Sequence, residues 1–164
     1  MAELSLVRIA AFIGVGGSLL AVAVPAFVRG LSASKLTEAL EGLHGISAAA
    51  VSKAETHRHE ESFPPSVGRT PEQVPRGVAA LDPPGTWDHL TWRALDFKVD
   101  RSHAFSFQFD SAMDPVSLTA RFSATAHGDL DGDGQTSTFQ VQGERRPGEP
   151  ARVLPGMLIN REYE

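Results

Sequence analysis

The chain of 164 residues contains no cysteine, which excludes disulfide bonds, thiolate zinc sites and a cysteine nucleophile. It also lacks an excess of basic residues: 15 Lys and Arg stand against 20 Asp and Glu, giving a formal net charge of −5. A protein that grips nucleic acid needs a basic surface, so this charge argues against that class. The sequence also lacks a P-loop, a glycine-rich dinucleotide turn and a Ser-His-Asp order. We therefore predict that the chain is not an enzyme, and assign no catalytic or cofactor-binding residue.

Charged residues are absent over residues 9–28, where the sequence reads IAAFIGVGGSLLAVAVPAFV. A helix rises about 1.5 Å per residue, so a helix of this length spans roughly the 30 Å hydrocarbon core of a bilayer. A buried core helix, a cleaved signal peptide and a retained membrane anchor are the three interpretations. The anchor is favoured because apolar residues then recur from Leu31 to Ala54, mostly at steps of three or four, with polar residues between them. Together these patterns predict one helix over about residues 4–56, with a membrane segment over about 4–28 and a kink at Pro25.

The residues of this region resemble those of type IV pilins and their pseudopilin relatives. Gly17 lies eight residues before Pro25 in the segment GSLLAVAVPAF, and Ser34, Lys35 and Thr-Glu-Ala at 37–39 follow. Further segments are similar to a pilin-like subgroup common in deltaproteobacteria: FPPSVG at 63–68 with TP at 70–71, Trp87 with residues 92–97, AHGDLDGDG at 126–134 with STF at 137–139, and NRE at 160–162. The same register puts Glu3 where pilins have their cleavage glycine and Arg8 where they have a glutamate. The signature of the prepilin peptidase is therefore missing.

This resemblance implies a fold and a function. The implied fold is α+β and pilin-like, with a long N-terminal helix over residues 1–56, membrane-embedded in its first half. The helix packs on a small antiparallel β-sheet in a head over residues 57–164. The implied function is that of a structural subunit, a minor or atypical pilin, in a type IV pilus-like or type II secretion pseudopilus filament.

The resemblance also implies a location and partners. The subunit would lie in the bacterial inner membrane with a periplasmic head, and then in a cell-surface pilus or a periplasmic pseudopilus. Its partners would be the lipid bilayer, an inner-membrane assembly platform and other pilin or pseudopilin subunits, and no nucleic acid is indicated.

Five residues of the apolar segment are assigned to assembly: Arg8, Gly14, Gly17, Ser18 and Pro25. Small residues at 10, 14 and 18 would form a ridge that lets helices approach closely within a membrane. Arg8 would either extend to the lipid headgroups or pair with the glutamate of a neighbouring pilin. Both interpretations stay open.

The head divides into a loop region and a sheet. Residues 57–86 are rich in proline and glycine, which predicts extended and turn-rich chain. Apolar residues alternate in the segments 104–110, 117–126 and 137–142, which predicts an antiparallel meander within a sheet over about residues 97–164. Phe105, Phe107 and Phe109 alternate along the first segment, and we expect them to face the core rather than a nucleic acid.

The sequence DLDGDG at 129–134 contains a candidate metal site. Asp129, Asp131 and Asp133 match the first three ligand positions of a calcium loop, and Gly134 matches its turn position. The twelfth position holds Gln140 in place of a bidentate Glu, and no helix signal flanks the loop, so an EF-hand is not expected. A calcium-tied hairpin and a plain Asp-Gly turn with solvated carboxylates both remain. The alternative function follows from the first of these: an exported domain with a cleaved signal peptide that acts as a calcium-dependent binding module.

Overall fold

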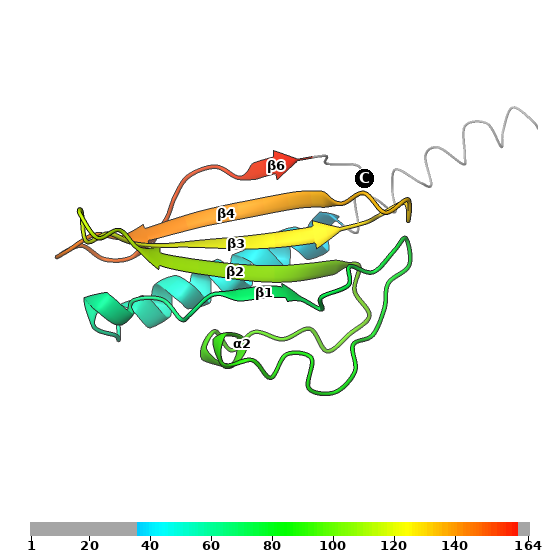
Figure 1. The fold of residues 1–164 in the computed structure, drawn as a ribbon, viewed down its shortest axis with the longest axis horizontal. Coiled ribbons are helices and arrows are strands. Elements are labelled where there is room, and N and C mark those ends of the chain that lie inside the picture. The colour runs from blue at the N-terminus through cyan, green and yellow to red at the C-terminus, as the bar shows by residue number, and fades with distance from the viewer. Residues whose placement is uncertain (1–35, 161–164) are drawn as a thin grey trace, which may run out of the picture. The chain divides into compact units, whose positions relative to one another are not determined.

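The computed structural model describes residues 36–160, which belong to one compact unit, Lys35–Glu164. In this part of the chain a helix over residues 36–54 and the short helix α2 (Leu90–Ala94) accompany a six-stranded sheet (Figure 1). The strands are β1 (Val67–Thr70), β2 (Phe105–Met113), β3 (Ala120–Gly128), β4 (Ser137–Arg145), β5 (Arg152–Val153) and β6 (Leu158–Asn160). A single 3-10 turn, His59–Glu61, follows the first helix.

The sheet is antiparallel throughout and has a simple order. Its strands run β1-β2-β3-β4-β5, and β6 also pairs with β4. The central strands β2, β3 and β4 are nine residues each and pair over their whole length. The edge strands are short: β5 pairs with the end of β4 and β6 with its beginning. A long meander therefore forms the middle of the sheet, with brief additions at both edges.

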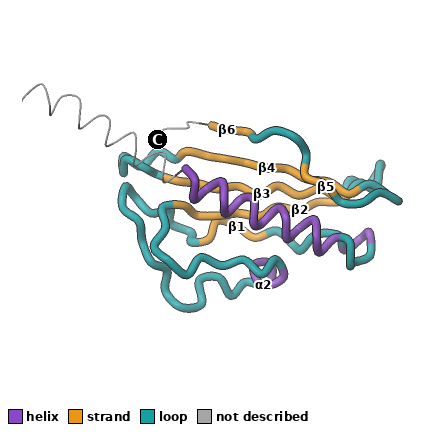
Figure 2. Tube along the Cα trace, turned by 180° about the vertical axis from the view of Figure 1, so that it is seen from behind, coloured by secondary structure: helices purple, strands orange, loops and turns teal. Residues whose placement is uncertain are grey.

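The helix of residues 36–54 lies across one face of the sheet (Figure 2). Its apolar residues recur at helical spacing, and five of them are fully buried: Ala39, Leu43, Ile46, Ala50 and Ala54. They meet a sheet face made of aromatic residues, because Phe105, Phe107 and Phe109 alternate along β2 and are buried. Gly42 permits the close approach: a Cβ built at this position would lie 2.4 Å from the ring of Phe107. The expectation that these three phenylalanines serve the core is confirmed.

Charged side chains fix both ends of this helix. Glu38 Oε1 accepts a hydrogen bond from the backbone N–H of Ala104 at 2.9 Å, and Glu55 Oε1 accepts one from Ala151 at 2.7 Å. Arg145 Nη1 donates to the carbonyl oxygens of Ala54 and His57. The last carbonyls of a helix have no partner within the helix, so this guanidinium completes its C-terminal end.

The predicted fold class, a pilin-like α+β fold with a long N-terminal helix packed on a small sheet, is wrong. The described residues are mostly β, with a six-stranded sheet, and their one long helix covers residues 36–54. No helix within residues 36–160 is long and apolar enough to cross a membrane. The predicted membrane segment, about residues 4–28, lies outside the described residues. The prediction relied on the apolar residues that recur at helical spacing. It did not include the short strands, whose sequences show no alternation of apolar and polar residues.

The sheet is larger than predicted because three strands have weak sequence signals. β1 lies inside the proline-rich region 57–86, which was predicted as loop, and β5 and β6 have only two and three residues. All three are edge segments, which need hydrogen bonds on one side only and do not need an alternating buried face.

Candidate functional site

The residues assigned to assembly, Arg8, Gly14, Gly17, Ser18 and Pro25, all lie outside the described residues. Their roles therefore remain predictions. The described part contains the candidate metal turn, a buried polar cluster and two apolar surfaces.

The acidic turn joins β3 and β4, whose facing ends Gly128 and Ser137 are paired. One carboxylate oxygen from each of Asp129, Asp131 and Asp133 lies within 4.8 Å of the others. Asp129 is only 2% exposed, and both of its oxygens accept backbone hydrogen bonds. Gly132 N donates to Oδ1 at 2.8 Å and Gly134 N to Oδ2 at 3.0 Å. The buried carboxylate of Asp129 thus stabilises the conformation of the turn by accepting these two backbone N–H groups.

The carboxylates of Asp131 and Asp133 are exposed, and each accepts a backbone hydrogen bond from a residue two positions further along the turn. Asp131 Oδ1 accepts from Asp133 N at 3.2 Å, and Asp133 Oδ1 accepts from Gln135 N at 2.7 Å. A carboxylate oxygen that accepts one N–H keeps a second lone pair, so the three acids offer a cation several oxygen ligands.

The residue at the twelfth loop position does not join these carboxylates. Gln140 lies in β4, and its Nε2 donates to Oγ1 of Thr125, its register partner on β3, at 3.3 Å. Among residues 36–160, this turn therefore offers a cation the three aspartates without the twelfth-position ligand of a calcium loop. The calcium interpretation stays a prediction.

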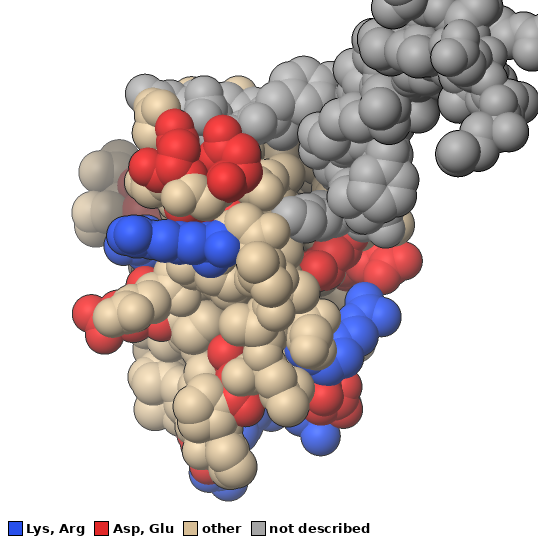
Figure 3. All heavy atoms as spheres, turned by 90° about the vertical axis from the view of Figure 1, so that its right-hand side faces the viewer, with Lys and Arg blue, Asp and Glu red and all other residues tan. Residues whose placement is uncertain are grey.

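A cleft of about 840 Å³ lies between this turn and the proline-rich loop. Its charged lining consists of Arg69, Glu72, Arg76, Asp82 and Asp129. Figure 3 shows this end of the molecule, where acidic and basic side chains lie close to one another. Neither sign of charge dominates the lining, so the cleft does not favour a ligand of one charge.

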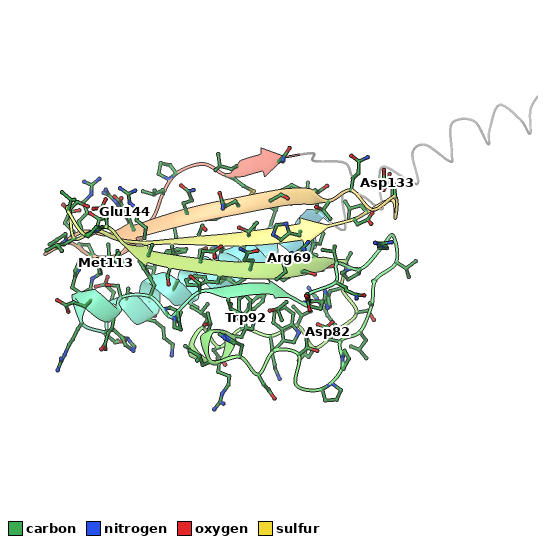
Figure 4. The ribbon with its side chains drawn as sticks, viewed as in Figure 1. Arg69, Asp82, Trp92, Met113, Asp133 and Glu144 are labelled. Atoms are coloured by element: carbon green, nitrogen blue, oxygen red, sulfur yellow. The ribbon has the colours of Figure 1, made fainter. Side chains whose placement is uncertain are left out.

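A buried polar cluster, formed by Asp82, Trp87 and His103, fastens the proline-rich loop to the sheet. His103 is fully buried; its Nε2 lies 2.8 Å from Asp82 Oδ2, and its Nδ1 lies 2.7 Å from the carbonyl oxygen of Phe105. Trp87 Nε1 donates to the same Asp82 oxygen at 2.8 Å. Figure 4 shows Asp82 in the loop beneath β1.

Sequence reasoning missed this cluster. His103 was one of several scattered histidines, and Asp82 stands in a segment predicted as loop. The contact spans 21 positions of chain, and no short motif marks it. The backbone adds to it, because Ala80 and His103 exchange two hydrogen bonds of 2.9 Å.

A polar pair, Ser106 and His127, lies on the sheet face opposite the helix. The two residues are paired in register across β2 and β3. Burial, and then the nearby Arg69 guanidinium, lower the pKa of His127. Ser106 Oγ and His127 Nε2 are buried and have no hydrogen-bond partner among the described residues. Because both atoms are covered, they do not form a nucleophile and base open to a substrate.

The connection between β2 and β3 forms an ordered tip, Asp114–Leu118, at the end of the sheet marked by Met113 in Figure 4. Asp114 Oδ1 accepts from Val116 N at 2.8 Å and Ser117 N at 3.0 Å. The N–H groups of Ser117 and Val116 thereby lower the pKa of the Asp114 carboxyl. Leu118 has a left-handed backbone with φ of 53°, and its carbonyl oxygen accepts a hydrogen bond from His59 Nε2. Val116 is 92% exposed and Leu118 54%.

An apolar groove of about 550 Å³ runs between the helix of residues 36–54 and the segment 153–157. Its lining is formed by Leu40, Leu43, His44, Ser47, Ala48, Val141, Val153, Gly156 and Met157. No carboxylate lines it, and Leu40 and Val153 are both partly exposed.

No known protein family, characterised protein or solved structure matches the chain. A functional assignment therefore rests on its own residues and geometry.

Proposed function

We propose that the chain is a structural subunit of a type IV pilus-like or type II secretion pseudopilus filament. In this proposal the uncharged segment 9–28 holds the subunit in the inner membrane and later joins it to other subunits. The observation that carries it is the short distance along the chain between that segment and a helix firmly bound to the head. Only seven residues, 29–35, separate residue 28 from the described helix at residue 36.

The attachment of this helix to the head supports the proposal mechanically. A subunit drawn out of a membrane by its apolar segment must transmit that force to its head. The helix of residues 36–54 has a fully buried face, and Glu38, Glu55 and Arg145 tie its two ends to the rest of the head. Force on residue 36 therefore reaches the sheet through packed side chains and hydrogen bonds rather than through a loose linker.

In this proposal the uncharged segment is the part of the subunit that packs against other subunits. Apolar side chains leave lipid at little cost only where other apolar side chains cover them, and in membranes small residues let helices pack closely. A minor or atypical subunit is the role most consistent with Arg8 at the position of the pilin glutamate. Arg8 would then pair with the glutamate of a neighbouring pilin and favour mixed assembly.

The first test is a substitution in the uncharged segment. We expect Leu19→Lys in the full chain to weaken membrane retention and to remove the protein from sheared surface filaments, because a buried lysine is costly in lipid. Leu81→Lys, at an exposed position of the loop, is the matched control and should change neither. The readouts are alkaline extraction of membranes and the sheared fraction of cells. Equal behaviour of the two variants would contradict the proposal.

The second test separates the two candidate functions. N-terminal sequencing of membrane-extracted protein should find the segment 9–28 still present. A mature start near Val24 or Phe27 would contradict the filament proposal and favour the exported binding module. The support for that alternative is the acidic turn, in which one carboxylate oxygen from each of the three aspartates lies within 4.8 Å of the others.

A further inference from the structure

The cleft between the acidic turn and the proline-rich loop lies at the end of the head where the helix of residues 36–54 begins. Glu38, in the first turn of that helix, accepts a hydrogen bond from the N–H of Ala104, immediately before β2. The start of β2 pairs with the end of β3, which leads into the acidic turn (Figure 1). Arg76 of the loop is bridged to Asp129 of the turn, so the loop lies at this end too.

The function proposed above keeps this end of the head close to the bilayer. Residues 29–35 join the uncharged segment to residue 36, and an extended chain spans at most about 3.6 Å per residue. Residue 36 therefore lies no more than about 30 Å from residue 28. A cleft at this end of the head can meet lipid headgroups, whereas the connection between β2 and β3 lies at the other end of the sheet.

The charged residues that line the cleft differ in whether they already have partners. Asp82 accepts a hydrogen bond from a buried tryptophan, and both oxygens of Asp129 accept backbone N–H groups. By contrast, the exposed side chains of Arg69, Arg76 and Glu72 make no hydrogen bond or ion pair within residues 36–160. The charges that the cleft leaves for a ligand are therefore two guanidiniums and one carboxylate.

This combination fits a ligand that carries both an anionic and a cationic group. Guanidiniums bind phosphate oxygens through paired N–H donors, and a carboxylate accepts hydrogen bonds from a primary ammonium. The headgroup phosphoethanolamine has both groups, and the cleft volume of about 840 Å³ falls within the usual range of small-molecule sites, about 300–1,000 Å³. Val78, two positions after Arg76, is 76% exposed, and an apolar side chain beside the cleft favours a lipid over a free headgroup.

We propose that the cleft binds the phosphoethanolamine headgroup of a membrane lipid, with the phosphate at Arg69 and Arg76 and the ammonium at Glu72. The bound headgroup holds the end of the head that carries residue 36 against the bilayer surface before the subunit leaves the membrane. That the lipid belongs to the subunit's own membrane rests on the function proposed above, while the binding of the headgroup in the cleft does not.

The first test uses the full chain in a maltoside detergent, without a bilayer. Because the chain has no cysteine, Val78→Cys can carry a single fluorophore whose emission reports polarity, and glycerophosphoethanolamine is the probe. We expect a saturable change in emission that Arg69→Gln weakens several-fold. Arg121→Gln, at an exposed position near the other end of β3, is the matched control and should leave the change intact. No saturable change, or an equal change in the two arginine variants, would overturn the proposal.

The second test separates a membrane lipid from a free headgroup. The labelled chain is reconstituted into phosphatidylcholine vesicles with or without phosphatidylethanolamine, and a lipid-bound quencher reports contact of the label with the bilayer. We expect phosphatidylethanolamine to raise quenching at residue 78 several-fold. A label on Val116→Cys, 92% exposed at the other end of the sheet, should show no such rise. Quenching at residue 78 that does not respond to phosphatidylethanolamine would overturn the docking of the head on this lipid.

Glu72→Gln tests the position of the ammonium in the same vesicles. With the carboxylate removed, the cleft offers a headgroup only guanidiniums as free charges. We therefore expect the preference for phosphatidylethanolamine over phosphatidylglycerol to disappear in Glu72→Gln. A preference that survives this substitution would contradict the proposed site.

The outcomes keep this proposal separate from the filament role. A headgroup signal in detergent from a chain that never enters sheared filaments would leave the cleft assignment standing and overturn the filament role. Sheared filaments in normal amount from a chain that gives no headgroup signal would overturn the cleft assignment and leave the filament role standing.

Discussion

Asp82 is the residue on which the fastening of the proline-rich loop depends. One of its oxygens accepts from Trp87 Nε1 and faces His103 Nε2, and both partner side chains are buried. Asp82→Ala would leave two buried polar groups without partners, at a cost of about 1–3 kcal/mol each. We expect a clear loss of unfolding free energy, measured by urea denaturation of the full chain. Asp88→Ala, at an exposed position of the same loop, is the control and should change it by less than about 0.5 kcal/mol.

The acidic turn and the buried cluster show what sequence patterns convey about single residues. The three aspartates were identified because their spacing follows a known ligand pattern and they lie within one turn. Asp82 and His103 were not identified, since their contact depends on how the loop folds back on the sheet. Local spacing thus predicts candidate sites within one turn, while a cluster assembled from distant segments is visible only in the fold.

At the scale of the elements, the helix of residues 36–54 contains a natural pair of test positions, Gly42 and Gly45. A Cβ at Gly42 would lie 2.4 Å from the ring of Phe107, whereas one at Gly45 meets no described atom within 4 Å. We expect Gly45→Ala to stabilise the protein by about 0.5–1 kcal/mol, because alanine favours the helix over glycine. Gly42→Ala should destabilise it, because the helix must move away from the sheet. Thermal unfolding checks both, and a similar gain for the two variants would contradict the close approach.

The elements also explain which parts of the fold were predictable. The central strands were predicted at 104–110, 117–126 and 137–142, and they occur at 105–113, 120–128 and 137–145. Alternation marks them because one face is buried against the helix. Strands β1, β5 and β6 are too short to show a period. The predicted sheet was therefore too small, and for that reason the predicted fold class was wrong. The sequence showed the apolar stripe that the helix buries. It did not show that residues 36–160 are mostly β, with a six-stranded sheet.

At the scale of the whole molecule, three groups with lowered pKa values predict sensitivity to acid. Hydrogen bonding from Arg152 lowers the pKa of Glu144, the N–H of Ser117 lowers that of Asp114, and burial lowers that of His127. In each case the unfolded chain takes up its proton at a higher pH than the folded protein does. Each group therefore stabilises the fold above its unfolded pKa, and this stabilisation is lost as the pH falls through the folded value.

The sign and order of these losses can be measured. Stability should begin to fall once the pH drops below the ordinary histidine value of 6.5, because His127 is protonated more readily in the unfolded chain. A second loss should follow below the ordinary glutamate value of 4.5, as Glu144 loses its charged bond to Arg152. His127→Gln should flatten the first phase of urea midpoints against pH, and Glu144→Gln should reduce the second. Glu149→Gln, at an exposed position, is the control, and a first phase that survives His127→Gln would contradict the assignment.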